Sequence, residues 1–252
     1  MKILVCENYD KLSEKAAQII MSQITLKSNS ILGLATGSTP IGMYKKLIEM
    51  YENKMIDFSE VKTFNLDEYQ NLPIDNNQSY HYFMDEHLFN YINVKRENIH
   101  IPNGMAIDIE KECMEYDDLI KNTGGIDIQV LGIGNNAHIG FNEPTVSFEK
   151  KTYVVELEES TRVANARFFN SLDEVPSKAI TMGIGSIFES KKIILLATGG
   201  NKAKAIYDTV YGKVTPEVPA SILQFHDDVV IILDKEAANL LNPVDYKIVL
   251  NI

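Results

Sequence analysis

Short, nearly continuous apolar runs alternate with stretches of helical periodicity along this chain. Runs of this kind are typical of strands that are buried on both faces of a parallel sheet. They cover residues 2–6, 30–35, 61–66, 126–131, 179–182, 192–197 and 229–233. Between them, apolar side chains share one helical face in residues 41–51, and helical patterns also cover residues 80–91, 109–121, 202–210 and 235–241.

This alternation of strands and helices predicts an α/β fold. Consecutive βαβ units build a mostly parallel, Rossmann-like sheet with helices on both faces, which is a three-layer α/β/α sandwich. No internal repeat and no Pro/Gly-rich linker divides residues 1–252, so we expect a single domain. Ligands of such sheets bind beyond the carboxyl ends of the strands, so functional residues should directly follow the apolar runs.

The chain is acidic, with 24 basic and 35 acidic residues and a formal net charge of −11. This balance argues against nucleic acid or an anionic membrane as a partner, so an anion would have to be bound by backbone amides and a few placed cations. No apolar run reaches the roughly 18 residues of a membrane span, and residues 1–10 hold too short an apolar segment for a signal peptide. We therefore expect a cytoplasmic protein. The five histidines show no HxxxH spacing and the two cysteines no CxxC pair, so no metal site is expected.

The turn after residues 30–35 has the composition of an anion site. Gly37 permits a tight backbone turn, and Pro40 suits the first position of a helix. Thr36, Ser38 and Thr39 each offer a hydroxyl as a hydrogen-bond donor. Free amides at a helix start together with hydroxyls can hold a phosphate. The same residues also fit a well-capped turn without a ligand, and no Gly-Lys-Ser/Thr follows that would make a Walker loop.

A second turn repeats this composition at residues 196–201, and Leu-Ala-Thr-Gly occurs at both 34–37 and 196–199. Lys202 follows in the predicted first helical turn, where the helix dipole disfavours a positive charge. A bound anion would offset that cost, whereas the alternative is an exposed surface lysine. The repeated tetrapeptide favours two turns that serve one site.

Acid–base candidates follow two other strands. Asp67 stands at the mouth of the run 61–66, where a carboxylate can act as a base or merely cap a turn. The run 126–131 leads into a Gly-rich segment that ends in His138 and Glu143. Histidine suits proton transfer because its ordinary pKa is about 6.5, and a carboxylate can fix its tautomer. The alternative for His138 is a structural histidine in a loop.

Two further signals in this region are ambiguous. Gly132-x-Gly134-x-x-Ala137 matches a dinucleotide fingerprint, but Gly140 and Pro144 interrupt the helix that this fingerprint requires. Arg167 precedes two phenylalanines and fits either a bidentate phosphate ligand or a surface ion pair.

Taken together, these segments resemble the glucosamine-6-phosphate deaminase family, and they follow the family's order over nearly the whole chain. The histidine segment and Asn-Leu-Asp-Glu-Tyr are the specific ones, whereas the Gly-rich turns alone are not. The matching pieces are Leu-Ala-Thr-Gly-Ser-Thr-Pro at 34–40, Asn-Leu-Asp-Glu-Tyr at 65–69, Leu-Gly-Ile-Gly at 131–134, His-Ile-Gly-Phe-Asn-Glu-Pro at 138–144, Arg-Phe-Phe at 167–169 and Ala-Thr-Gly-Gly-Asn-Lys-Ala at 197–203.

The resemblance implies that glucosamine 6-phosphate and water give fructose 6-phosphate and ammonium, without a metal or other cofactor. It implies that His138, oriented by Glu143, moves the proton that opens the sugar ring, and that Asp67 takes the C2 proton and returns it at C1. The phosphate would be held by Thr36, Gly37, Ser38, Thr39, Arg167 and Lys202.

Asn136 departs from the family pattern, because many members carry Asp-Gly before the histidine and this chain carries Asn136-Ala137. We include Asn136 in the catalytic group, but an amide supplies no charge, so Glu143 would do more of the electrostatic work. Hexameric, allosteric members use basic residues soon after the Asn-Glu-Pro turn and an extended C-terminus. Here that stretch reads Thr-Val-Ser-Phe-Glu-Lys-Lys-Thr-Tyr-Val-Val at 145–155, and the tail stops at Asn251-Ile252. We therefore expect a non-allosteric monomer or simple homo-oligomer. Residues 156–176 are charged and lack a buried pattern, so we also expect them to form a lid over the site.

Two alternatives remain open at this level. A 6-phosphogluconolactonase would share the fold and the phosphate turn but would not need Asp67 as a carbon-acid base. A sugar-phosphate-sensing module without catalysis usually carries a DNA-binding segment, and none is visible in this acidic chain.

Overall fold

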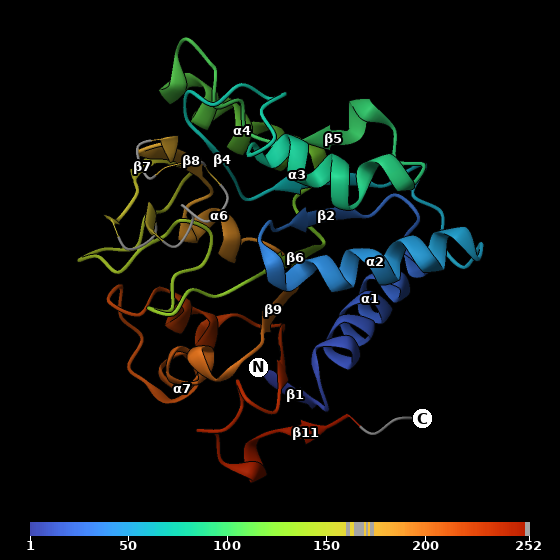
Figure 1. Cartoon of the computed structure of the whole chain (residues 1–252), viewed down its shortest axis with the longest axis vertical. Helices are drawn as coiled ribbons and strands as arrows, with labels where there is room; N and C mark the ends of the chain where they lie inside the picture. Colours follow the sequence, from blue (N-terminus) through green and yellow to red (C-terminus); the bar gives the residue numbers. More distant parts are fainter. Residues whose placement is uncertain (160–161, 164–168, 170, 172–173, 250–252) are drawn as a thin grey trace.

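The computed structural model describes residues 1–159, 162–163, 169, 171 and 174–249. In these residues an eight-stranded sheet with the order β11-β1-β10-β9-β6-β2-β3-β5 runs through the molecule (Figure 1). All its pairings are parallel, which confirms the predicted fold class. The strands are β1 Lys2–Cys6, β2 Ile31–Leu34, β3 Lys62–Asn65, β5 Ile99–His100, β6 Ile128–Leu131, β9 Ile193–Ala197, β10 Val229–Asp234 and β11 Lys247–Ile248.

Helices cover both faces of this sheet. One apolar core lies between the sheet and α1 Tyr9–Leu26, α2 Ser38–Glu52 and α3 Tyr80–His87. The other lies between the sheet and α4 Ile109–Thr123, α6 Ile184–Phe188 and α7 Ala203–Tyr211. Short 3-10 helices complete the described connections: η1 Phe89–Tyr91, η2 Arg96–Asn98, η5 Gly200–Lys202, η6 Pro219–Phe225 and η7 Pro243–Asp245.

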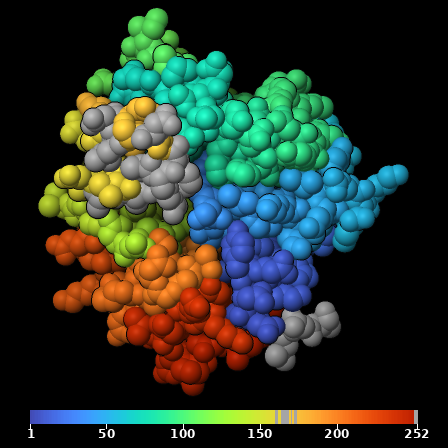
Figure 2. Space-filling view, viewed as in Figure 1, coloured from blue at the N-terminus to red at the C-terminus, as the bar shows by residue number. Residues whose placement is uncertain are grey.

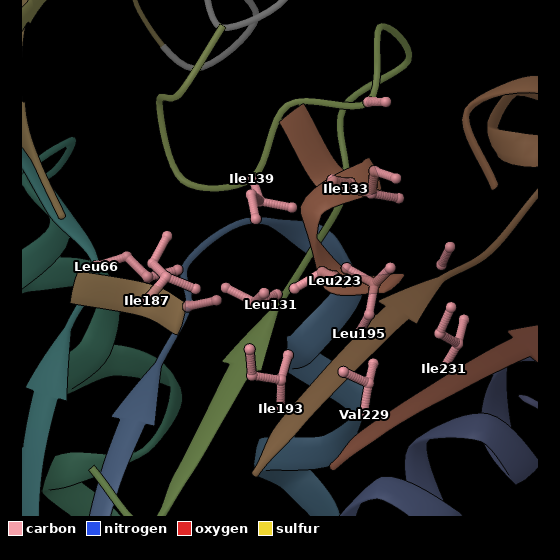
Figure 3. Packing of buried hydrophobic residues seen from close by; sticks show 14 of the residues in the cluster. Leu66, Leu131, Ile133, Ile139, Ile187, Ile193, Leu195, Leu223, Val229 and Ile231 are labelled. Carbon is pink, nitrogen blue, oxygen red and sulfur yellow. The ribbon is translucent and has the colours of Figure 1, made fainter. Parts of the chain in front are cut away.

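The near-continuous apolar runs of the strands reflect this double burial. In β9, Ile193 and Leu195 face one core while Ile194 and Leu196 face the other. Figure 3 shows Ile133 and Ile139, from the loop after β6, over the carboxyl ends of the strands. Both side chains are buried in the same core as Ile193, so this loop is anchored to the sheet. The first and last strands of the described chain are also neighbours, because β1 pairs with β10 and β11. Figure 2 shows the blue N-terminal part of the chain beside the red C-terminal part.

A second sheet stands beside the carboxyl edge of the first. It has three strands in the order β4-β8-β7: Asp67–Tyr69, Lys178–Thr181 and Tyr153–Glu156. Its pairings are antiparallel. The apolar run at 179–182 is therefore a strand as predicted, but it lies outside the parallel sheet. The apolar run predicts the strand, but its pairing partners are set by segments distant in sequence, which a local pattern does not show.

Three element predictions need correction. Residues 235–240 form hydrogen-bonded turns in place of a helix; the segment is short, and Pro243 follows it closely. Helix α2 begins at Ser38, so Pro40 is its third residue and not its first. Helix α1 was not predicted, although the Asn8 side chain caps it by accepting a hydrogen bond from the Lys11 N–H. The proposed lid at 156–176 contains residues 160–161, 164–168, 170 and 172–173, which lie outside the described residues.

Candidate active site

A cavity of about 560 Å³ opens at the carboxyl ends of the central strands. It lies where an open α/β sheet places its ligand, beside the segments that follow β2, β3, β6 and β9. The lining includes most of the residues that the sequence analysis selected: Thr36, Gly37, Ser38, Thr39, Asp67, Asn136, His138 and Lys202. Arg167, the remaining phosphate candidate, lies outside the described residues.

The first turn presents the start of α2 to the cavity. Gly37 has a φ of 96°, a backbone conformation that favours glycine, and no side chain caps the helix that it introduces. The Tyr9 hydroxyl holds this turn, because its oxygen lies 3.0 Å from both the Ser38 and the Thr39 carbonyl oxygens, to either of which it can donate, and it accepts from the Gly42 N–H. The result is a helix start held by hydrogen bonds, whose hydroxyls and amides can bind an anion.

The second turn brings Lys202 to the same cavity. Its backbone is held by the buried Asp234, whose carboxylate accepts hydrogen bonds from the Gly199 N–H and the Thr198 hydroxyl. Lys202 ends η5 and lines the cavity. The first turn and Lys202, which follows the second turn, therefore line the same cavity.

His138 and Glu143 form a hydrogen-bonded pair. The imidazole Nδ1 lies 3.1 Å from Glu143 Oε2, and the Asn136 amide donates to the same oxygen at 2.6 Å. Because the buried carboxylate is an acceptor, Nδ1 is the protonated nitrogen and Nε2 is left to exchange protons. A Cβ at Gly134 would lie 2.4 Å from the imidazole, so this glycine makes room for His138. Ala137 adopts a φ of 66°, which is rare for a residue with a side chain.

Asp67 is 6% exposed and lines the cavity from β4. Burial, and then the negative charge of the adjacent Glu68, raise the pKa of this carboxyl to about 8. A carboxylate with that pKa is a stronger base than an ordinary aspartate, and its acid form can return a proton near neutral pH.

Two residues of the site were missed by sequence analysis. Tyr80, the first residue of α3, lines the cavity, and its ring stacks on Phe141 with 6.2 Å between centroids. Glu68 is 1% exposed and accepts hydrogen bonds from the backbone N–H groups of Tyr69, Tyr80 and His81. The His81 Nδ1 also lies 2.8 Å from Glu68. Glu68 belongs to the motif at 65–69, but its hydrogen bonds depend on where α3 packs in the fold. No local sequence pattern predicts that packing.

The described residues contain no cluster of three or more His, Cys, Asp or Glu side chains that could hold a metal ion. In the same part of the chain, none of the helices combines the length and the apolar character that a bilayer crossing requires.

Comparison with known proteins places this geometry in a family. The family model for glucosamine-6-phosphate isomerases/6-phosphogluconolactonase matches residues 7–232. A glucosamine-6-phosphate deaminase of Clostridium botulinum (strain Alaska E43 / Type E3) is 91% identical over 249 residues, covering 99% of this chain and 100% of the relative. A deaminase of Clostridioides difficile (strain 630) is 64% identical over the same length and with the same coverage.

Solved structures agree with the sequence relatives. A monomeric glucosamine-6-phosphate deaminase superimposes with a TM-score of 0.93 at 47% identity, covering 95% of this chain and 100% of that one. A 6-phosphogluconolactonase of Thermotoga maritima has a TM-score of 0.74 at 18% identity, covering 93% and 100%, which shows the shared fold alone. This chain therefore belongs to the glucosamine-6-phosphate isomerase/6-phosphogluconolactonase family.

Proposed function

We propose that this chain is a glucosamine-6-phosphate deaminase, which converts glucosamine 6-phosphate and water to fructose 6-phosphate and ammonium. The observation that carries the proposal is the meeting of Asp67 and His138 at one cavity, with Glu143 paired to His138 and with the start of α2 and Lys202 in the same lining. The relatives at 91% and 64% identity bear this activity in their names.

Phosphate binding is the first task of the site. We assign it to the start of α2, where Thr36, Ser38 and Thr39 supply hydroxyls and amides, and to the ammonium of Lys202, which lines the same cavity. Arg167 completes the proposed set as a bidentate ligand. With the phosphate fixed at this end, the sugar ring extends toward Asp67 and His138, which line the same cavity.

Ring opening is the task of His138. The cyclic sugar opens when the C1 hydroxyl loses a proton and the ring oxygen gains one, and Nε2 of a neutral imidazole can carry that proton. Glu143 stabilises the imidazolium that forms in between, and the Asn136 amide keeps the Glu143 oxygen directed at Nδ1.

Isomerisation is the task of Asp67. Its carboxylate removes the C2 proton of the open-chain aldehyde to give an enol-type intermediate, and the same carboxyl returns the proton to C1. Water then adds at C2 and ammonium leaves, so the product is the ketose phosphate. A pKa of about 8 suits both halves of this exchange, because the carboxyl must act first as base and then as acid.

The finer assignments belong to the same proposal. We propose a monomer without allosteric activation, since the solved relative at 47% identity is described as monomeric. We propose one domain over residues 1–252, since both ends of the chain contribute strands to one sheet. A cytoplasmic setting fits two buried free cysteines, Cys6 and Cys113. The reaction would serve as the hydrolytic deamination step of amino-sugar and N-acetylglucosamine degradation.

The decisive experiment measures ammonia and fructose 6-phosphate together from the purified protein supplied with glucosamine 6-phosphate. We expect equal amounts of the two products and a hyperbolic dependence on substrate. Hydrolysis of 6-phosphogluconolactone without ammonia release would instead assign the lactonase activity, and sugar-phosphate binding without either reaction would indicate a sensing module.

A further inference from the structure

The two catalytic segments of the proposed deaminase come from different parts of the chain, and strand β8 lies between them. Asp67 is on β4, where it pairs directly with Thr181 of β8 in the antiparallel ladder. At the next residue, the Met182 N–H donates to the Leu66 carbonyl at 2.8 Å. The end of β8 is therefore fixed to the segment that carries the carbon base.

Thr181, the last residue of β8, and the following residue Met182 also hold the loop that carries His138 and Glu143. The Phe141 N–H donates to Thr181 Oγ1 at 3.1 Å, and the Asn142 amide donates to the Met182 carbonyl at 2.8 Å. Thr181 and Met182 are fully buried. These bonds grip the middle of the loop, between His138 and Glu143.

Gly140 shows how closely the pieces fit. It lines the cavity with a φ of 58°, and a Cβ placed there would lie 2.9 Å from Thr181 Oγ1 and 3.7 Å from Asp67 Oδ2. The Thr181 hydroxyl, the Gly140 backbone and the Asp67 carboxylate are thus packed together, and Gly140 and Asp67 line the cavity.

We propose that Thr181 is a positioning residue, whose hydroxyl sets the distance between Asp67 and the His138 loop by holding the Phe141 amide against β8. This inference rests on the proposed function, because it concerns two groups that must act on one sugar. Without the hydroxyl, the buried Phe141 N–H loses its acceptor, and the loop must shift to satisfy it. A displacement of about 1 Å between reacting groups can lower a rate by about 100-fold.

Thr181→Val tests the proposal, because valine keeps the β-branched shape and lacks the hydroxyl. Thr181→Ser keeps the hydroxyl and loses one methyl group. The matched control is Thr63→Val, since Thr63 is buried on β3 and its hydroxyl has no hydrogen-bond partner among the described residues. Each variant is assayed well below its unfolding temperature for kcat, and for competitive inhibition by 2-deoxyglucose 6-phosphate, which keeps the phosphate and lacks the amino group.

We expect Thr181→Val to lower kcat by about tenfold or more while the inhibition constant changes by less than about threefold, because the phosphate turns are untouched. Thr181→Ser should stay within about threefold of the unchanged protein, as should Thr63→Val. If Thr181→Val does not fold, Thr181→Ala replaces it, with the same expectations.

Three results would overturn the proposal: an unchanged kcat in Thr181→Val, an equal loss in Thr181→Ser, or a parallel loss of inhibitor binding. The last two would show that shape or general stability, and not the hydroxyl, is what matters. Absence of ammonia release from the unchanged protein is a separate result, which would count against the proposed function itself.

Discussion

His138 depends on the glycine that precedes it by four residues. A Cβ atom at position 134 would lie 2.4 to 2.6 Å from three ring atoms of the His138 imidazole, which is too close for any side chain. The glycine therefore makes room for the imidazole, and this packing accounts for the second glycine of the pattern that resembles a dinucleotide fingerprint. Two residues after Gly134, the Asn136 amide donates a hydrogen bond to Glu143 Oε2, the same oxygen that faces His138. Within this group of three side chains, the negative charge therefore comes from Glu143.

Asp67 gives the sharpest prediction at the residue scale. Asp67→Asn keeps the shape of the side chain and removes the base, so exchange of the C2 proton with solvent should fall below detection while 2-deoxyglucose 6-phosphate still binds. The exchange is measured by NMR in deuterated buffer. An exposed carboxylate, Asp75, offers the matched control, and Asp75→Asn should exchange normally. Persistent exchange in Asp67→Asn would assign the C2 proton to another group.

The same substitution should change how stability depends on pH. The folded-state pKa of Asp67 is about 8 against an ordinary 3.8, so the folded protein holds a proton that the unfolded chain releases. The stability from this carboxyl is complete below pH 4 and is lost as the pH rises toward 8, at no more than about 1.4 kcal/mol per pH unit. Asp67→Asn should lack this loss and be the more stable protein at pH 8, as measured by urea unfolding. An equal pH slope in both proteins would contradict the raised pKa.

At the scale of elements, the positions of the functional segments were predictable and their supports were not. Buried strands announce themselves by continuous apolar runs, and polar residues directly after them indicate the sheet edge where ligands bind. That logic located Asp67, His138 and Lys202 from sequence. Strands β4 and β7 escaped it because Asp67–Tyr69 and Tyr153–Glu156 lack such runs. Their pairing with β8, and the docking of α3 on Glu68, arise only when distant segments meet.

Asp234 is a support of this kind, and it makes a prediction about the second anion turn. Its carboxylate accepts from Thr198, from the Gly199 N–H and, at 2.8 Å, from the Ala237 N–H. In Asp234→Asn an amide group must face one of these donors, which loosens the turn before Lys202. Because we propose that this turn serves the phosphate through Lys202, and not the reacting carbons, KM should rise by about tenfold, equivalent to about 1.4 kcal/mol, with a smaller change in kcat.

Steady-state kinetics checks this expectation, and Asp228→Asn is the control. Asp228 pairs with Lys192 at the opposite end of the same strands, so its loss should leave KM within about twofold. If Asp234→Asn lowered kcat and left KM unchanged, the second turn would be acting on the chemistry and not on phosphate binding.

At the scale of the whole molecule, the carboxyl edge of the central sheet, where its parallel strands end, and the amino edge, where they begin, have different roles. The carboxyl edge holds the cavity, with a buried aspartate whose ionisation costs stability. The amino edge holds Asp127, 5% exposed, which accepts hydrogen bonds from Lys27, Lys191 and the Ile31 N–H. Burial alone would raise the pKa of Asp127, but these partners outweigh it and hold the pKa below its usual value. One buried aspartate therefore opposes the fold at neutral pH while the other supports it.

Asp127→Ala should separate stability from activity. It removes the shared partner of two lysines and leaves the buried Ile31 N–H without an acceptor, so the free energy of unfolding at pH 7 should fall by roughly 3 kcal/mol. Because a lowered pKa gives stability that is present above about pH 4 and lost below it, the gap between variant and unchanged protein should narrow as the pH falls through that range. Urea unfolding measures the gap, and kinetics at low temperature should give kcat and KM within about twofold, since the site lies at the other edge. A fall in kcat without a loss of stability would mean that the two edges are coupled through the sheet. It would contradict the assignment of activity to the carboxyl edge and of stability to the amino edge.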